Sequence, residues 1–299
     1  MDREHLKIGF IRRGYSRSGG AEAYLKRLGH ALQAQGHEAR LITTEEWPPN
    51  EWLFGAVTRV PGRTPLQFAD MVEASRSRFG CDVLMSLERV WRCDVMRAGD
   101  GVHRVWLARR GGLWTKLRLA FNAKHRAILR LEESLYRRRG AARVIANSAM
   151  VKREIIETYD YPPAQIDVVP NGLPLEQFRS DDAARARERA ALQLAPDDVA
   201  IVFVGSGWER KGLRYAIGAL EKLNDPKLRL LVAGRGNASS YSSRFVRHLG
   251  EVSDVAALLR AGDIFVLPTT YDPFSNACLE ALAAGLPIVT TRANGFSEA

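Results

Sequence analysis

The sequence predicts an α/β protein made of two Rossmann-like, doubly wound domains in tandem. Short apolar runs of strand type alternate with segments of helical spacing along nearly the whole chain, a pattern typical of a parallel sheet covered by helices. A stretch with several prolines interrupts this alternation near residue 170. The length of 299 residues also fits two domains of roughly 150 residues each.

The first domain, residues 1–170, begins with a strand, a glycine loop and a helix. Residues 7–11, KIGFI, form an apolar run, and from Ala21 the apolar side chains recur at helical spacing until Gly36. The next apolar run, at 38–44, completes a βαβ unit. The same reasoning predicts further strands at 81–87, 94–99 and 142–148, and helices at 67–79, 116–139 and 149–158.

The character of the chain changes between residues 160 and 198, where prolines and a Pro-Asn-Gly turn at 170–172 precede a polar helix. We therefore assign residues 171–299 to a second domain and expect a ligand in the cleft between the strand C-termini of the two domains. Because residue 299 comes just after a strand, we expect this domain to be truncated at its C-terminus. The predicted elements of the second domain are strands at 200–206, 228–234, 263–269 and 287–291, and helices at 212–223, 252–262 and 276–285.

Composition excludes several classes of protein. Hydrophobic residues make up 46% and charged residues 26% of the chain, which excludes a disordered or fibrous protein. No apolar run approaches the roughly 18–20 residues of a membrane span, and the charged N-terminus does not resemble a signal peptide. The three cysteines, Cys81, Cys93 and Cys278, are too few and too scattered for a disulfide framework or a zinc site. We therefore expect a cytoplasmic protein with reduced thiols.

Most of the net charge of +10 comes from one stretch of the chain, because residues 101–140 hold eleven basic and two acidic side chains and so contribute +9. Within residues 103–139, apolar side chains from Leu117 to Leu135 follow one helical stripe. This pattern predicts an amphipathic helix that binds peripherally to an anionic membrane surface, on the cytoplasmic face. The alternative is that the stripe packs on the domain core and the charges are solvated. No RNA-binding signature accompanies the segment, so nucleic acid is not an expected partner.

Three short motifs are candidates for chemistry, and the first is the glycine loop. Gly19 and Gly20 lie at the turn between the first strand and the first helix. Glycine lets the backbone approach a ligand closely, and the N-terminus of the following helix favours an anion. The alternative is a plain tight turn. The dinucleotide fingerprint GxGxxG is absent, since GRGNAS at 234–239 matches only its first half, and this disfavours an NAD-dependent enzyme.

The second motif, GSGWERKGL at 205–213, directly follows a predicted strand. Gly205 opens the turn, and Arg210 and Lys211 lie just before the next helix. Two adjacent cations at the carboxyl end of a strand suit a diphosphate, which arginine can bind as a planar fork and lysine as a compact charge. The alternative is a solvated basic turn.

The third motif, at 269–291, contains two carboxylates. Asp272 lies on the loop after a strand, and Glu280 follows eight positions later on a helix, where it can face the same side. Such a pair suits sugar hydroxyls, one set on a transferred hexose and one on a nucleotide ribose. The alternative is an acid that stabilises the helix dipole and an exposed glutamate. Backbone amides at the start of the helix are further candidates to face the ligand, at Phe274, Ser275 and Asn276.

The stretch DPFSNACLEALAAGLPIVTT at 272–291 resembles the acid-x7-Glu signature of the retaining, family 4 glycosyltransferases of GT-B fold. These usually read E-P-F-x-x-x-x-L-E-A-M-A-x-G-x-P-V-V. The glycine loop, PNG at 170–172 and GWERKG at 207–212 resemble the other motifs of the family in the same order, so the resemblance spans essentially the whole chain. Two features depart from the family pattern: Asp272 replaces the first glutamate, and the C-terminal helices of the family are missing.

Within this family, the sequence is most similar to the lipopolysaccharide inner-core α-glucosyltransferases that act on heptose. The likeness includes DVMRAGDGVHRVWLARR at 94–110, in which Asp100 corresponds to an acceptor-side carboxylate. The resemblance implies transfer of a hexose, glucose above all, from a nucleotide sugar such as UDP-glucose to a lipid-linked or lipopolysaccharide core acceptor, with retention of configuration.

The resemblance also implies a role for each candidate residue. Arg210 and Lys211 would neutralise the leaving diphosphate electrostatically, so neither a metal nor a cofactor is expected. Asp272 would hold hydroxyls of the donor sugar, Glu280 the ribose, and Asp100 the acceptor side. Gly19 and Gly20 would let the first domain close over the phosphates and the acceptor.

Three other interpretations remain open at this point. A nucleotide-sugar 2-epimerase of the same fold would need neither a lipid acceptor nor the basic segment. A non-catalytic membrane-surface binding protein would use only the basic segment. An inactive transferase is compatible with the aspartate at position 272 and the absent C-terminal helices.

Overall fold

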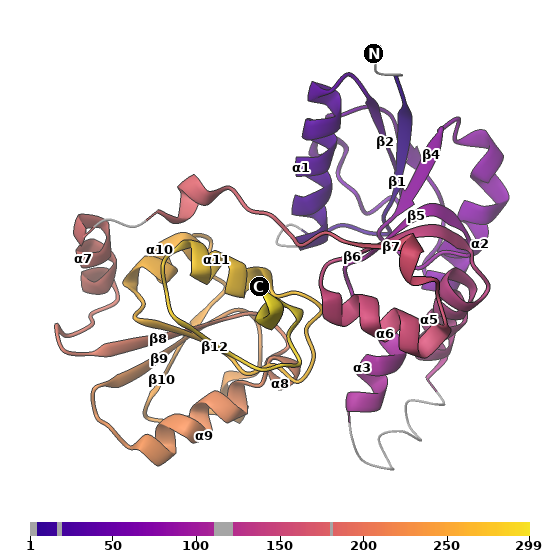
Figure 1. The fold of residues 1–299 in the computed structure, drawn as a ribbon. Helices are drawn as coiled ribbons and strands as arrows, with labels where there is room; N and C mark the ends of the chain where they lie inside the picture. The colour runs from indigo at the N-terminus through magenta and orange to yellow at the C-terminus, as the bar shows by residue number, and fades with distance from the viewer. Residues whose placement is uncertain (1–4, 17–19, 111–121, 180–181) are drawn as a thin grey trace. The chain divides into compact units, whose positions relative to one another are not determined.

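The computed structural model describes residues 5–16, 20–110, 122–179 and 182–299 (Figure 1). The chain divides into two compact units, residues 1–170 and 171–299, which we call the first unit and the second unit. The first contains a seven-stranded sheet of order β3-β2-β1-β4-β5-β6-β7, and the second a five-stranded sheet of order β10-β9-β8-β11-β12. Every strand pair is parallel. The predicted α/β class with two Rossmann-like domains is therefore confirmed.

The strands of the first unit follow the predicted apolar runs, with two additions at the sheet edges. Residues 57–59 and 166–168 form three-residue strands in which most side chains are not buried, so they lack the apolar pattern that predicts a strand. The strands of this unit are β1 (Lys7–Ile11), β2 (Glu38–Thr43), β3 (Val57–Arg59), β4 (Val83–Ser86), β5 (Cys93–Ala98), β6 (Ala141–Ala146) and β7 (Ile166–Val168).

Local capping sets where two helices of the first unit, α2 and α6, begin. Thr64 forms a capping box with Gln67, and Pro65 takes the first helical position of α2. Ser148 caps α6, which ends at Asp160 in the left-handed region. The helices described in this unit are α1 (Gly20–Ala34), α2 (Pro65–Ser75), α3 (His103–Arg109), α5 (Ala123–Glu132) and α6 (Ala149–Tyr159).

The prediction of one helix over 116–139 is wrong. Helix α5 begins only at Ala123, because Asn122 is extended and its side chain accepts hydrogen bonds from the first-turn amides. The helix continues as a π-helical turn, Glu133–Arg137. Residues 111–121 lie outside the described residues.

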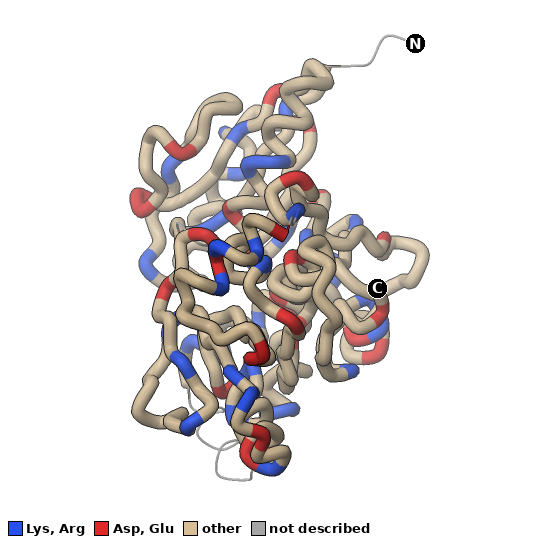
Figure 2. Tube along the Cα trace, turned by 90° about the vertical axis from the view of Figure 1, so that its left-hand side faces the viewer, with Lys and Arg blue, Asp and Glu red and all other residues tan. Residues whose placement is uncertain are grey.

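The apolar stripe of that segment is also partly misassigned. Leu131 and Leu135 are fully buried in the first unit, as the alternative interpretation proposed, so they are not available to a membrane. Three of the described cations are paired, Arg104 and Arg137 with Glu133, and Arg109 with Glu154. Figure 2 shows basic residues, in blue, interspersed with acidic ones, in red, along the described chain. None of the helices in the described ranges is both long and apolar enough to span a bilayer.

A buried carboxylate joins α3 to α5. Glu132 is fully buried and accepts hydrogen bonds from Arg89 Nε at 3.0 Å and from the hydroxyl of Tyr159 at 2.7 Å. It also accepts from the backbone amides of His103 and Arg104, at 2.8 and 3.1 Å. Because α3 starts at these two amides, a side chain 29 residues away caps it, which local sequence does not reveal.

In the second unit the helix predicted at 212–223 is present as α9 (Leu213–Leu223), and a short helix that was not predicted, α8 (Trp208–Lys211), precedes it. Gly212 adopts a left-handed conformation, with φ of +78°, between α8 and α9. A side chain at this position would overlap the carbonyl oxygen of Pro268. The elements of this unit are strands β8 (Val199–Val204), β9 (Leu228–Ala233), β10 (Val246–Gly250), β11 (Ile264–Leu267) and β12 (Ile288–Thr290), and helices α7 (Asp182–Ala191), α8 (Trp208–Lys211), α9 (Leu213–Leu223), α10 (Val255–Ala261) and α11 (Asn276–Ala283). Strand β10 was not predicted, because it is an edge strand of sequence VRHLG.

Candidate functional site

The second and third motifs meet at the carboxyl edge of the five-stranded sheet. Strand β8 ends at Val204 and β11 at Leu267, and the two strands are neighbours in the sheet. The segments that follow them, 205–212 and 268–276, therefore leave the sheet side by side. This edge is where open α/β sheets bind ligands.

Three predicted site residues form one ionic cluster at this edge. The ammonium of Lys211 pairs with Asp272 Oδ2, and Arg210 Nη1 lies 3.6 Å from the same oxygen. Arg210 Nη1 also donates to the carbonyl of Tyr271 at 2.8 Å. The side chain of Asp272 is only 8% exposed, so its negative charge is stabilised by the two cations rather than by water. One carboxylate against two cations leaves a net positive charge, which suits an anionic ligand.

The backbone carbonyl of Arg210, like its side chain, is hydrogen-bonded to the segment after β11. Its carbonyl oxygen accepts three hydrogen bonds, from Thr269 Oγ1 at 2.9 Å, from Thr270 Oγ1 at 3.1 Å and from the amide of Thr270 at 2.9 Å. These bonds tie α8 to the segment after β11. Sequence analysis did not single out the two threonines, because an ordinary Thr-Thr pair carries no signal for this contact.

Gly205 lies against the stem of Lys211. A side chain at position 205 would come to 3.4 Å from Lys211 Cε. That distance is ordinary van der Waals contact, so position 205 favours glycine for its backbone φ of +151° rather than for space. Gly205 is placed beside the ionic cluster, as the motif order suggests.

Polar groups at the start of α11 form hydrogen bonds within the second unit. Ser275 donates its amide to Asn294 Oδ1 at 3.2 Å, and its hydroxyl caps the helix by accepting from the amide of Cys278 at 3.3 Å. Phe274 is buried, with its ring 5.8 Å from that of Phe296. The amide of Ser275 is therefore occupied within the unit rather than free to face a ligand, whereas the role of the Phe274 and Asn276 amides stays a prediction.

Two asparagines, Asn276 and Asn294, form hydrogen bonds around the start of α11. The side-chain oxygen of Asn276 accepts from Asn171 Nδ2 at 2.7 Å. Asn294 is fully buried, and the amide of its neighbour Gly295 donates to the carbonyl of Asp272 at 2.9 Å. Neither Asn294 nor Gly295 was singled out from the sequence, although Asn-Gly is a common turn signal.

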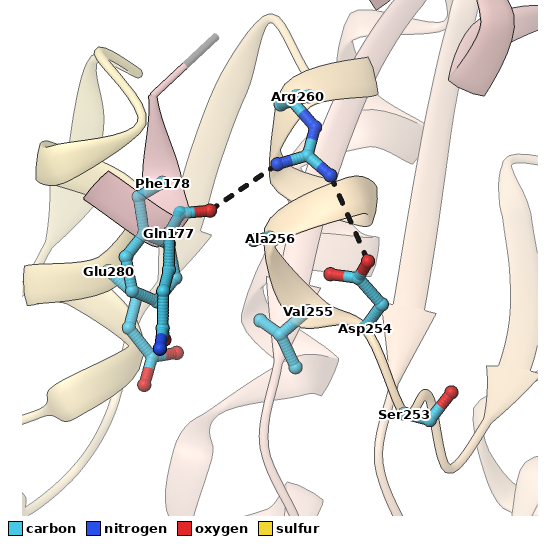
Figure 3. Close-up of a pocket in the computed structure, with 8 residues that line it drawn as sticks. All are labelled: Gln177, Phe178, Ser253, Asp254, Val255, Ala256, Arg260 and Glu280. Atoms are coloured by element: carbon cyan, nitrogen blue, oxygen red, sulfur yellow. Dashed lines mark hydrogen bonds and ion pairs between the residues drawn. The ribbon is translucent and has the colours of Figure 1, made fainter. Parts of the chain in front are cut away.

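Glu280 lines a separate cavity of the second unit. The cavity has a volume of about 610 Å³, and neither Asp272 nor the two cations line it. Arg260 crosses one wall, with Nη1 donating to the carbonyl of Gln177 at 3.4 Å and Nη2 lying 3.8 Å from Asp254 Oδ2 (Figure 3). Glu280 lies on α11 and Asp272 on the loop before it, so the expectation that both face one ligand stays a prediction. The cavity is lined by Gln177, Phe178, Ser253, Asp254, Val255, Ala256, Arg260 and Glu280.

In the first unit, Gly20 is the first residue of α1, whereas Gly19 lies outside the described residues. Asp100 comes two residues after β5. Its side chain is 65% exposed and lies 3.9 Å from Arg89 Nη1. The structure thus places Asp100 at the carboxyl edge of the seven-stranded sheet, beside a cation that also holds Glu132.

A second charged cluster at this edge was missed by sequence analysis. Arg12 follows β1 and donates to Glu22 Oε1 at 3.2 Å and to Glu88 Oε1 at 2.9 Å. Burial raises the pKa of Glu88, and the charge of Arg12 opposes that rise. The three residues are 10 to 76 positions apart, and no local motif joins them.

The two clusters differ in the chemistry they allow. The second-unit cluster joins two cations to one carboxylate, which suits an anion, whereas the first-unit cluster joins one cation to two carboxylates. Within the described ranges, no group of three His, Cys, Asp or Glu side chains is arranged to hold a metal ion.

Comparisons with known proteins connect both units to one kind of enzyme. The model of Glycosyltransferase Family 4 matches residues 18–177, and that of Glycosyl transferases group 1 matches residues 198–299. An uncharacterized glycosyltransferase of Methanocaldococcus jannaschii is 27% identical, over 94% of this chain and 78% of its own length. A D-inositol 3-phosphate glycosyltransferase of Mycobacterium tuberculosis is 33% identical over 52% of this chain, which spans only 35% of that protein.

Solved structures share the fold at low sequence identity. WaaG, a glycosyltransferase involved in lipopolysaccharide biosynthesis, superposes with a TM-score of 0.81 and 20% identity, covering 97% of this chain and 82% of WaaG. HepE of Anabaena, solved in complex with UDP-glucose, superposes with a TM-score of 0.71 and 19% identity, covering 98% and 82%. These likenesses support the GT-B arrangement of the fold.

Proposed function

The chain belongs to Glycosyltransferase Family 4, and from this premise we propose that it is a retaining hexosyltransferase. The donor is a nucleotide diphosphate sugar, with UDP-glucose as the first candidate. The acceptor is a lipid-linked sugar or a lipopolysaccharide core sugar, with heptose as the first candidate. The structural likeness to WaaG and to the UDP-glucose complex of HepE supports this choice.

The observation that carries the proposal is the cluster of Arg210, Lys211 and Asp272. When the bond between the anomeric carbon and the diphosphate breaks, negative charge develops on the leaving oxygen. Two preorganised cations stabilise that charge more in the transition state than in the ground state. Their positions are fixed by Asp272 and by the carbonyl of Tyr271, so little reorganisation accompanies the reaction.

The remaining residues would bind the other parts of the two substrates. Glu280, in the wall of its cavity, would accept hydrogen bonds from the ribose hydroxyls. Asp272 would hold the donor sugar only through the part of its carboxylate that Lys211 leaves accessible. Asp100, which is largely exposed, would orient the acceptor.

Retention follows if the acceptor attacks the face from which the diphosphate leaves. The bond from the anomeric carbon to the phosphate oxygen breaks, and a bond to the acceptor oxygen forms on the same face. The acceptor proton passes to the departing phosphate oxygen, so no nucleophilic carboxylate is needed. The two cations take the place of a metal ion in this scheme, and the reaction is expected to proceed in the presence of a chelator.

Incubation of the protein with UDP-glucose and a heptose-terminated core acceptor is expected to give an α-glucosylated product and UDP. Nuclear magnetic resonance of the product reports the anomeric configuration, and EDTA is expected to leave the rate unchanged. GDP-mannose and other UDP-hexoses, tested in parallel, identify the donor. Conversion of the donor in the absence of any acceptor would favour the 2-epimerase, and the proposal fails if no nucleotide sugar is consumed.

We also propose that the enzyme binds the cytoplasmic face of an anionic membrane through the basic segment. Lys124 and Arg126 are exposed on α5, and Arg138 is exposed after the π-helical turn that follows this helix. Each cation near an anionic leaflet contributes on the order of 1 kcal/mol. The enzyme and a lipid acceptor in that leaflet would then both be confined to the plane of the membrane, which favours their encounter.

Replacement of Lys124 and Arg126 by glutamine is expected to lower binding to vesicles with anionic lipid by about tenfold or more. Binding of the unchanged protein is expected to weaken as salt is raised, because exposed charges are screened. Vesicle sedimentation measures both effects. Replacement of Arg187 and Lys222, two exposed cations of the second unit, is the matched control. Equal binding to neutral and anionic vesicles would contradict the proposal.

A further inference from the structure

Two glycine-containing turns lie against each other at the carboxyl edge of the second sheet. Strand β8 is followed by Gly205, Ser206 and Gly207, and β9 by Gly234 and two further residues. The amide of Arg235 donates to Ser206 Oγ at 3.1 Å. A side chain at Gly234 would overlap the carbonyl of Gly205. The two turns therefore form one closely packed support below the segment that carries Arg210 and Lys211.

The side chain of Trp208 packs against both glycine-containing turns. It is buried, and its indole N–H donates to the carbonyl of Gly205 at 2.9 Å. A side chain at Gly236 would overlap the indole ring, so the second turn is shaped to receive a large aromatic residue. A buried tryptophan with its N–H satisfied packs in one orientation.

Two more aromatic rings complete the contact. His248, on β10, stacks on the indole with ring centroids 5.1 Å apart and an angle of 21° between planes. Tyr241 meets it edge to face at 5.7 Å. The indole thus contacts elements from β8, β10 and the segment after β9.

Trp208 is also the first residue of α8, a helix of four residues that carries both cations. Glycines with left-handed backbone, Gly207 and Gly212, flank this helix. Its direction is therefore set by its anchors rather than by the adjoining chain. One anchor is the carbonyl of Arg210, bound to Thr269 and Thr270. The other is the indole of Trp208.

We propose that Trp208 is a positioning residue, which aims Arg210 and Lys211 at the diphosphate of the nucleotide sugar. This inference rests on the proposed function, because it requires a diphosphate ligand at the ionic cluster. Trp208 itself does not pair with the ligand in this scheme. Without the indole, the start of α8 is no longer held against the two turns, and the two cations lose part of the fixed direction on which charge-assisted hydrogen bonds depend.

The test compares two ligands that differ only in the diphosphate. UDP engages both the cations and the nucleoside site, whereas uridine engages only the nucleoside site. Trp208→Ala is expected to weaken UDP binding by about 10- to 100-fold, the effect of losing one or two well-aimed charged hydrogen bonds. Binding of uridine is expected to change less than about twofold. Ligand-observed magnetic resonance titration measures both, and GDP with guanosine and ADP with adenosine are run in parallel.

Two further variants separate positioning from general damage. Trp208→Phe keeps a stacked ring but loses the hydrogen bond to Gly205, and it is expected to retain most of the UDP affinity. Gly236→Ala displaces the indole while keeping Trp208, and it is expected to reproduce the selective loss for UDP. Tyr215→Ala, which removes a half-exposed aromatic residue of α9, is the matched control and is expected to leave both affinities unchanged.

The possible results distinguish this inference from the proposed function. A selective loss for the diphosphate ligand supports it. An equal loss for UDP and uridine, or UDP binding that Trp208→Ala leaves unchanged, overturns the positioning role alone. Failure of the unchanged protein to bind any of the three nucleoside diphosphates overturns this inference and the proposed function together.

Discussion

Lys211→Ala is expected to lower kcat for glycosyl transfer by at least about 100-fold, the typical cost of removing one preorganised group that stabilises a developing negative charge. Lys211 is the cation in direct contact with Asp272, and its neighbour Arg210 remains to bind the ground-state diphosphate. We therefore expect the larger effect on kcat and a smaller one on the KM for the donor. Steady-state assays at several donor concentrations separate the two parameters.

This substitution also removes the partner of a buried carboxylate, so a control for folding is needed. Asp272→Asn added to Lys211→Ala removes the carboxylate that has lost its direct partner, and the double variant is expected to regain thermal stability without regaining turnover. Glu280→Ala, in the separate cavity, is expected to raise the KM for the donor more than it lowers kcat. If both Lys211→Ala and Glu280→Ala remain fully active, the site is assigned to the wrong residues.

Glu132→Ala is expected to lower the free energy of unfolding of the first unit by about 3–5 kcal/mol, the range for breaking a buried ion pair. The carboxylate is fully buried and accepts from Arg89, from Tyr159 and from the two amides that begin α3. Its removal leaves the Arg89 charge without its nearest partner and the end of α3 uncapped. Urea unfolding followed by tryptophan fluorescence measures the change.

Glu133 provides the matched control for this prediction. It is the next residue in the chain and pairs with Arg104 at 3.3 Å and Arg137 at 2.7 Å, with 28% of its side chain exposed. Because solvent screens such pairs, Glu133→Ala is expected to cost less than about 1 kcal/mol. Similar losses for the two variants would show that Glu132 is not the centre of this network.

The apolar runs of the sequence predict the fold well where the strands are central. Residues 7–11 and 199–204 are largely buried in their sheets, so their composition alone indicates a strand. Strands β3, β7 and β10 lie at the edges of their sheets, where one side of the strand faces away from the core. Their sequences contain polar or charged residues, so they lack the apolar run from which a buried strand is predicted.

In the basic segment, the spacing of apolar residues predicts a helix but not the surface against which the helix packs. A helical stripe of apolar residues has the same spacing whether it packs on a core or on a membrane. Leu131 and Leu135 pack on the core, which spacing alone left undecided. The break at Asn122 has a local cause, since asparagine is a strong N-cap.

For the candidate site, the sequence by itself determined the residue types and their positions at the ends of strands, because strand, turn and helix signals are local. Only the tertiary structure decided which of these residues meet. Lys211 and Asp272 are 61 residues apart and are joined because β8 and β11 are neighbours in the sheet. Asp272 and Glu280 are eight residues apart and yet belong to different surroundings. The physical reason is that a pairing or a cavity is formed by groups from several elements, whose approach depends on how the whole unit buries its apolar surface.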